Sequence, residues 1–328
     1  MSKDDGLSLR EFLLSKSRNI RVTDPRHPYN WDFTPPYEME GAPDGSRALC
    51  PVGPWTTATE EAVWKERPDS LVLSYVYKFE GEPTLRFLPT GLPVRRLAVL
   101  YGIESFDGIE ALGETLELLD IDRCGPQACV NLQGLPCLQS LSAHWSQFAC
   151  SLSQASPELR KLNVVGGYPG STLEDFPLSD QLEELVLNTP ARLESLAGLE
   201  QFTRLRRLEV LYASRLSGLT GPAAAPPLLE DLRFWSCSRM KSIAGLQGLT
   251  RLRKLELNNC ARIDSIGPLR SLVRLETLHA WGTTRIMDED LTPVAELPRL
   301  KKLNMAERKQ YRPLVEEIQR SRGLRTHG

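Results

Sequence analysis

The stretch "LRKLELNNCARIDSIGPLRSLVR" (residues 252–274) has the same skeleton as the 23 residues before it, "LEDLRFWSCSRMKSIAGLQGLTR" (residues 229–251). Both segments place apolar residues at positions 1, 4 and 6 and a cysteine at position 9, while the letters between them change freely. A chain that holds only its apolar positions constant is holding the positions that face a shared interior. The stretch therefore predicts a repeat protein.

The skeleton recurs about ten times along most of the chain, at spacings of 21 to 25 residues. The segments begin at Val94, Leu116, Leu138, Leu159, Leu182, Leu205, Leu229, Leu252, Leu275 and Leu300. Position 9 is usually a small residue, cysteine or threonine, as in Cys124, Ser146, Cys237, Cys260 and Thr283.

The spacing of the apolar residues changes halfway through each segment. Positions 4 and 6 alternate with 3, 5 and 7, which predicts a short strand that points its leucines to one side. In the second half the apolar residues recur every three positions, as in Leu193, Leu196 and Leu199, which indicates short 3₁₀ or irregular turns. One segment cannot bury its own leucines, so the segments must stack into an α/β solenoid.

These segments resemble the leucine-rich repeat family, whose pattern L-x-x-L-x-L-x-x-N/C is matched by "LRKLELNNC" and "LEDLRFWSC" over about residues 94–308. The chain departs from the pattern at position 9 in Gly102, Gly167, Pro190 and Ala213. The resemblance implies a right-handed horseshoe with a concave parallel β-sheet and a convex face of 3₁₀ or irregular segments, capped at both ends. It also implies a non-catalytic protein that binds another protein or a peptide on the concave face.

Three regions follow from this pattern. Residues 1–70 are rich in proline, glycine and aromatics and form a non-repeat N-terminal capping region or arm. Residues 71–308 form the solenoid, with its first clear repeat at 94. Residues 309–328 form a C-terminal capping helix and tail, with Pro313 near the helix start.

Within the N-terminal region, helices are expected over 7–16 and from a Thr59 cap through Trp64, and a strand over 70–77. The alternative to a cap is an extended arm carrying Tyr29 and Trp31, which would reach a partner or fold over the concave face.

Charges at positions 2 and 3 alternate in sign from one segment to the next, as in Arg206 and Arg207 followed by Glu230 and Asp231. In a parallel stack with strands about 4.8 Å apart, each basic pair lies beside an acidic pair. We therefore expect these charges to hold neighbouring repeats together.

The outward positions 5, 7 and 8 supply the candidate binding surface. Exposed Trp, Tyr and Arg dominate interface hot spots because they bury much area at little entropic cost. The partner-binding candidates are Tyr101, His144, Trp145, Tyr212, Arg233, Trp235, His279 and Trp281. Some of these rings could instead be covered by the N-terminal region, and Glu209, Arg233 and Glu256 could form a charge ladder that satisfies itself.

A second candidate is a column of arginines that precede the outer segment in five consecutive repeats: Arg192, Arg215, Arg239, Arg262 and Arg285. Such a basic edge could hold an anionic ligand or a nucleic-acid backbone. The nearly balanced composition, with 40 Lys plus Arg against 42 Asp plus Glu, makes nucleic acid the less favoured partner.

No nucleotide-binding, metalloprotease or serine-hydrolase motif occurs in the sequence. The cysteines and His144 lack the spacing of a zinc site, so we expect no metal and no cofactor. The alternative to a binding protein is an enzyme, or an enzyme subunit, that uses the N-terminal region.

The sequence contains no apolar run long enough to cross a membrane, and its N-terminus lacks the apolar stretch of a signal peptide. Seven cysteines, an odd number spread over 328 residues, favour free thiols over a disulfide framework. Both observations predict a cytoplasmic protein with no membrane partner.

Overall fold

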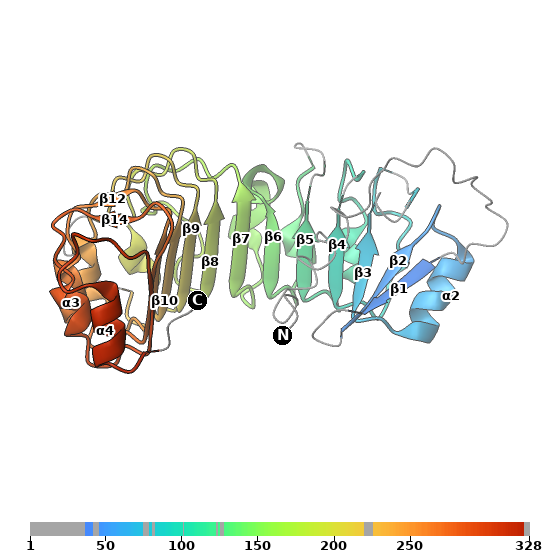
Figure 1. Ribbon diagram of the computed structural model, residues 1–328. Coiled ribbons are helices and arrows are strands. Elements are labelled where there is room, and N and C mark those ends of the chain that lie inside the picture. Colours follow the sequence, from blue (N-terminus) through green and yellow to red (C-terminus); the bar gives the residue numbers. More distant parts are fainter. Residues whose placement is uncertain are drawn as a thin grey trace, which may run out of the picture. The chain divides into compact units, whose positions relative to one another are not determined.

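The computed structural model describes residues 37–41, 46–74, 79–80, 83–100, 102–122, 124, 128–219 and 226–324. The chain forms two compact units, Met1–Leu159 and Arg160–Gly328. In each unit the strands stand side by side in chain order (Figure 1). Tyr101, Tyr29, Trp31 and the helix expected over 7–16 lie outside the described residues.

The first unit is built on the strands β1 (Tyr37–Gly41), β2 (Arg47–Pro51), β3 (Ser70–Leu73), β4 (Arg96–Val99), β5 (Leu118–Ile121) and β6 (Ser140–His144). β1 runs antiparallel to β2, and the pairs from β2 to β6 are parallel. Helix α2 (Thr57–Glu66) connects β2 to β3. Its N-cap is Thr56 and not the expected Thr59, because the Thr56 hydroxyl accepts from the Thr59 N–H while Thr59 bonds back to the Thr56 N–H.

The second unit is built on the parallel strands β7 (Lys161–Gly166), β8 (Glu184–Asn188), β9 (Arg207–Leu211), β10 (Asp231–Trp235), β11 (Lys254–Asn258), β13 (Thr277–Ala280) and β15 (Lys302–Met305). A separate pair, β12 (Arg262–Ile263) and β14 (Arg285–Ile286), lies beyond the ends of β11 and β13 along the chain. Helix α4 (Val315–Ser321) follows β15.

Strand register confirms the stacking that the leucines predict. Position 4 of each repeat pairs with position 4 of the next, as Leu208 with Leu232 and Leu232 with Leu255. These leucines are fully buried, and so are the position 6 residues Val210 and Phe234. Each such leucine contributes about 1.5–3 kcal/mol by leaving water, and this shared core is what a single repeat lacks.

Short helices occupy the second halves of the repeats, as the period of three predicts. They are η3 (Ile109–Leu112), η4 (Leu132–Gly134), η5 (Trp145–Gln147), η6 (Ala149–Gln154), η7 (Leu199–Gln201), η8 (Ala244–Gly248), η9 (Gly267–Ser271) and the short α3 (Thr292–Ala295). Their apolar residues, such as Leu199 and Leu269, pack into the same core as the strands.

In three repeats the cysteine at position 9 closes the turn after the strand through its side chain. The thiols of Cys237 and Cys260 donate to the carbonyls of Val210 and Phe234 in the preceding repeats, both at 3.5 Å. Cys124 donates to the Val99 carbonyl in the same way, at 3.7 Å. A buried carbonyl without a donor is costly, so this residue holds neighbouring coils together.

Two of the expected position 9 residues are wrong. Thr284 and not Thr283 is the buried residue, and its hydroxyl donates to the Leu257 carbonyl. Ser146 is exposed, and the neighbouring Gln147 is buried and donates to the Cys124 carbonyl. In both turns, the side chain that bonds to the preceding repeat belongs to the residue one position after the expected one.

Ion pairs between neighbouring strands confirm the expected alternation of charge. Lys161 contacts Glu184 at 2.7 Å, and Glu276 contacts Arg253 at 2.8 Å and Lys301 at 2.7 Å. The hydrogen bonds from Lys301 and Arg253 lower the pKa of Glu276 below its ordinary value. Such exposed pairs contribute little individually, because water screens them, but they repeat along the stack.

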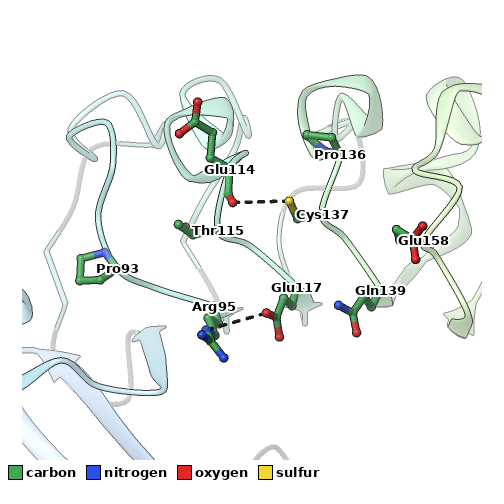
Figure 2. A pocket seen from close by; sticks show the side chains of 9 residues that line it. All are labelled: Pro93, Arg95, Glu114, Thr115, Glu117, Pro136, Cys137, Gln139 and Glu158. Atoms are coloured by element: carbon green, nitrogen blue, oxygen red, sulfur yellow. Dashed lines mark hydrogen bonds and ion pairs between the residues drawn. The ribbon is translucent and has the colours of Figure 1, made fainter.

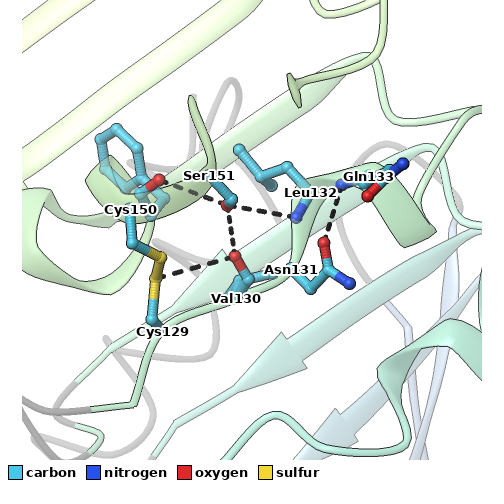
Figure 3. Close-up of a disulfide and its surroundings, with 8 residues drawn as sticks. Cys129, Val130, Asn131, Leu132, Gln133, Cys150 and Ser151 are labelled. Carbon is cyan, nitrogen blue, oxygen red and sulfur yellow. Dashed lines mark hydrogen bonds between the residues drawn. A yellow bond between two sulfur atoms is a disulfide. The ribbon is translucent and has the colours of Figure 1, made fainter. Parts of the chain in front are cut away.

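The first unit contains a disulfide between Cys129 and Cys150, which corrects the expectation that all seven cysteines are thiols (Figure 3). The two cysteines are 21 residues apart, one repeat length, so stacking brings them onto adjacent coils. Beside them the Ser151 hydroxyl donates to the Val130 carbonyl and accepts from the Leu132 N–H at 3.2 Å. Cys50, Cys124, Cys137, Cys237 and Cys260 are free thiols.

Candidate functional site

Three large aromatic side chains are exposed at the ends of strands in the second unit: Trp235 ends β10, and Tyr212 and Trp281 directly follow β9 and β13. Tyr212, Trp235 and Trp281 are 52%, 44% and 54% exposed, among the most exposed large apolar side chains of the described residues. We call these three residues the aromatic row. Large rings in water at three of four successive repeats do not contribute to the core, so packing does not explain them.

Strand pairing fixes the spacing of the aromatic row. Trp235, at the end of β10, lies beside Leu211 of β9 and Asn258 of β11. Trp281 follows β13, one strand further, so the two tryptophans stand about 10 Å apart along the sheet. Asn258 lies between them and is buried: its Oδ1 accepts from the Trp281 N–H and its Nδ2 donates to Glu256 Oε2, both at 3.1 Å.

Position 8 takes a left-handed backbone conformation in five successive repeats, at Thr189, Tyr212, Ser236, Asn259 and Gly282. Gly282 is required there, because a Cβ would collide with Asn259 Oδ1. At Tyr212, φ is 57° and the N–H donates to the Trp235 carbonyl at 2.7 Å. The next repeat thus holds the backbone of Tyr212 in a conformation that disfavours bulky side chains, and its ring stays in solvent.

A row of charged side chains lies at position 5, beside the aromatic row. These side chains neutralise one another, which confirms the predicted charge ladder of Glu209, Arg233 and Glu256. Arg233 contacts Glu209 at 2.9 Å, Asp231 at 2.6 Å and Glu256 at 3.8 Å. Burial opposes the charge of Arg233, but the hydrogen bond to Asp231 and the three carboxylates together raise the pKa of Arg233 above its ordinary value. We call Glu209, Arg233, Glu256 and His279 the charge row.

His279 ends the charge row on β13. Its Nδ1 lies 3.6 Å from Glu256 Oε1. Burial lowers the pKa of His279 below 6.5, and the nearby cations Lys254, Lys302 and Arg233 lower it further against the pull of Glu256. His279 is therefore neutral near pH 7 and adds no charge to this face.

Two first-unit candidates within the described residues, His144 and Trp145, contribute to local structure. His144 is exposed, and its side chain caps η5, with Nδ1 2.9 Å from the Ser146 hydroxyl oxygen. Trp145 is half-buried and packs edge-on against the buried Phe148, with ring centroids 5.4 Å apart. Less of the Trp145 ring is therefore available to a partner than of the rings in the aromatic row.

The arginine column is only partly brought together. Arg192, Arg215, Arg239 and Arg262 are exposed and Arg285 is half-buried. Arg215 lies 3.8 Å from Glu194. Arg262 and Arg285 pair directly, as partners in β12 and β14.

A pocket of about 470 Å³ lies in the first unit (Figure 2). It is lined by Pro93, Arg95, Glu114, Thr115, Glu117, Pro136, Cys137, Gln139 and Glu158. Arg95 faces Glu117 at 3.8 Å, and the Cys137 thiol donates to the Glu114 carbonyl at 3.4 Å. These groups interact with one another and do not converge on the cavity.

Among the described residues, no three His, Cys, Asp or Glu side chains are grouped so that they could hold a metal ion. No helix in the described parts of the chain has the length and apolar character needed to cross a bilayer.

No protein-family profile matches the chain, and no curated protein matches its sequence. Among solved structures, it is similar to an internalin from Listeria monocytogenes (15% identity, 80% of this chain and 83% of that one, TM-score 0.43). It is also similar to a leucine-rich repeat protein of Leptospira interrogans (18%, 76% and 58%, 0.45). A third is the plant peptide hormone receptor RGFR1 in complex with RGF2 (15%, 84% and 41%, 0.47).

The assignment of the fold rests on this chain's own repeats. The described strands are parallel and in register from β2 to β6 and from β7 to β15, the position 4 and 6 side chains are buried, and short helices fill the second halves. Both units therefore have the leucine-rich repeat fold.

Proposed function

We propose that the chain is a non-catalytic interaction module that binds another protein or a peptide, as an adaptor, an inhibitor or a recognition subunit. The observation that carries this proposal is the aromatic row, which keeps two tryptophans and a tyrosine in solvent at the ends of three strands of one unit. Trp and Tyr are the residues that most often dominate binding energy at protein interfaces.

The charge row supports a partner held mainly by apolar contacts at this face. Arg233 is surrounded by three carboxylates, and His279 is neutral, so few of these charges remain for long-range attraction. A surface of this kind provides specificity through hydrogen bonds at its rim and affinity through its rings. Binding should then depend only weakly on salt, unlike binding to a nucleic-acid backbone.

The test compares the double variant Trp235→Ala/Trp281→Ala with Trp64→Ala. Trp64 lies on α2 in the first unit and is 45% exposed, so it matches the two rings in chemistry and exposure. Proteins captured by immobilised wild type are quantified by mass spectrometry, and the affinity of each captured partner is then measured with purified components. We expect the double variant to lose the partner and Trp64→Ala to retain it.

Thermal unfolding serves as the control for folding. Exposed positions contribute little to stability, so each variant should stay within about 1 kcal/mol of wild type. A partner that binds wild type and the double variant with equal affinity would exclude the aromatic row as its site. Loss of binding by all variants, Trp64→Ala included, would argue for non-specific capture by exposed rings.

We propose a cytoplasmic location, supported by five cysteines held as free thiols, four of them buried. The Cys129–Cys150 bond is the feature that argues the other way, because disulfides persist in oxidising compartments. The state of this pair in the cell is therefore the measurement that tests the proposed location.

A further inference from the structure

A second pocket lies in the second unit, beside the two-stranded sheet of β12 and β14. It has a volume of about 290 Å³ and is lined by Ala261, Arg262, Thr283, Arg285 and Arg308. A water molecule occupies about 30 Å³ of liquid volume, so the pocket has room for a small ion with part of its hydration shell. Three guanidinium groups and a hydroxyl line it, and no carboxylate does.

Strand pairing forces two of these arginines together. Arg262 and Arg285 are direct partners in the parallel register of β12 and β14, and the Arg285 N–H donates to the Ala261 carbonyl at 2.7 Å. Paired residues on adjacent strands stand about 4.8 Å apart, and like charges in such positions destabilise a sheet. An anion bound between them would attract both guanidinium groups and offset the repulsion between them.

Arg308 brings a third guanidinium from the loop after β15. Its Nη2 donates to the Thr284 carbonyl at 3.3 Å, which ties the side chain to the turn that precedes β14. Its Nε is buried and has no hydrogen-bond partner. An arginine donor without an acceptor costs free energy, so this guanidinium still lacks part of its bonding.

The charge row of the same unit shows how this chain neutralises an arginine elsewhere. Arg233 contacts three carboxylates on its own and the adjacent strands. Among the ion pairs formed between described residues, none involves Arg262, Arg285 or Arg308. Among the described residues, three arginines therefore line one pocket and no carboxylate lines it or forms an ion pair with them.

We propose that this pocket binds an oxyanion of the phosphate class, either free phosphate or the terminal phosphate of a phosphomonoester. Guanidinium groups present planar donor pairs that match two phosphate oxygens at once. A dianion would accept from Arg262 and Arg285 across the two strands, and from Arg308 on the third side. Thr283 offers a hydroxyl donor at the same wall.

The test titrates the full chain with orthophosphate and follows binding by ³¹P NMR, with sodium chloride added to keep ionic strength constant. The main variant is Arg262→Gln, since this side chain is exposed and its loss spares the core. The matched control is Arg239→Gln, an exposed arginine of the same column that does not line the pocket. We expect Arg262→Gln to bind at least about tenfold more weakly and Arg239→Gln to bind like wild type.

A second variant, Arg308→Lys, keeps the charge and removes the forked donor, so it should also weaken binding while the fold is retained. A parallel titration with O-phosphoserine, and with serine as its control, distinguishes the sources of the anion. Tighter binding of O-phosphoserine assigns the pocket to a phosphorylated side chain, and tighter binding of orthophosphate assigns it to the free ion.

No binding of either compound, or equal binding by wild type and Arg262→Gln, would overturn the proposal. Equal weakening by Arg239→Gln would also overturn it, because it would show attraction to the arginine column as a whole. No protein partner is present in these titrations, so a negative result would not bear on partner binding by the aromatic row. A negative result for the aromatic row would likewise not bear on phosphate binding in the pocket.

Discussion

At the residue scale, Tyr212 shows how one repeat position serves two purposes. Asn259 occupies the same position two repeats later, in the same left-handed conformation, and its side chain accepts from the Thr283 N–H at 3.1 Å. Asparagine tolerates that conformation, whereas a bulky ring does not adopt it without strain. An exposed, strained aromatic residue fits a role in contacting a partner better than a role in the fold.

The substitution Tyr212→Asn tests this interpretation. It should raise the free energy of unfolding by up to about 1 kcal/mol, because asparagine adopts the left-handed region more readily. The same change should weaken binding of a partner held by the aromatic row. Urea denaturation and an affinity measurement provide the two readouts. Ser236→Asn, at the same position of the next repeat, should leave the affinity unchanged; if Tyr212→Asn retains full affinity, the ring is not part of the binding surface.

His279 provides a pH-dependent test. Its pKa is lowered from 6.5 in the folded chain, mainly by burial, so the unfolded chain takes up the proton first as the pH falls. The stability contributed by neutral His279 is present above about pH 6.5 and is lost as the pH falls toward the lower, folded pKa. Urea midpoints at about pH 7.5 and 5.5 should therefore fall more for wild type than for His279→Asn. An equal fall in both proteins would refute the assignment.

At the element scale, the charge row couples β9, β10 and β11. Arg233 on the central strand faces Glu209 on one side and Glu256 on the other. Lys254 also contacts Glu256, at 2.7 Å, and Arg207 contacts Glu209. Arg233 is the cation that contacts all three carboxylates, so it relieves most of the repulsion between them.

Arg233→Met tests this role. It should lower the free energy of unfolding by about 1–3 kcal/mol, because it leaves Glu209, Asp231 and Glu256 close together with fewer donors. Arg253→Met is the matched control: Arg253 pairs with Glu276 at an exposed site, where water screens the pair and a smaller loss of stability is expected. Urea denaturation of both variants gives the comparison. Equal losses would mean that the charge row is no more than a set of surface pairs.

At the scale of the whole molecule, the cysteines fall into two groups, free thiols and one bonded pair. Four free cysteines are buried, and three of them, Cys124, Cys237 and Cys260, close turns between repeats. Cys129 and Cys150 are joined across one repeat length, beside the hydrogen bonds of Ser151. Because Ser151 links the same two segments, they remain connected when the disulfide is reduced.

Alkylation followed by intact mass measurement tests both the pairing and the proposed compartment. Denatured, air-exposed protein should take up five labels, which is seven cysteines less the bonded pair, and seven after reduction. Protein from cells that are quenched with acid and then alkylated in denaturant should take up seven labels if it resides in the reducing cytoplasm, because the denaturant exposes the four buried thiols. Five labels in cells would place the chain in an oxidising compartment and refute the proposed location.

Stacking and register could be predicted from the sequence, because apolar residues at positions 4 and 6 can be buried together in only one alignment of successive repeats. Leu208, Leu232 and Leu255 pair as that alignment requires. The outward placement of Trp235 and Trp281 follows from the same alternation. These features depend on local periodicity, which a single sequence displays in full.

The path of the turns between repeats was decided only by the tertiary structure. Thr284 replaces Thr283, Trp145 packs on Phe148, and Arg308 joins Arg262 and Arg285 from a distant loop. Each depends on left-handed residues and on loop lengths that vary from repeat to repeat, and no periodic pattern encodes them. Periodicity thus determined which side of each strand is buried, while the contacts between coils determined which exposed side chains meet, because those contacts join residues that are far apart in the chain.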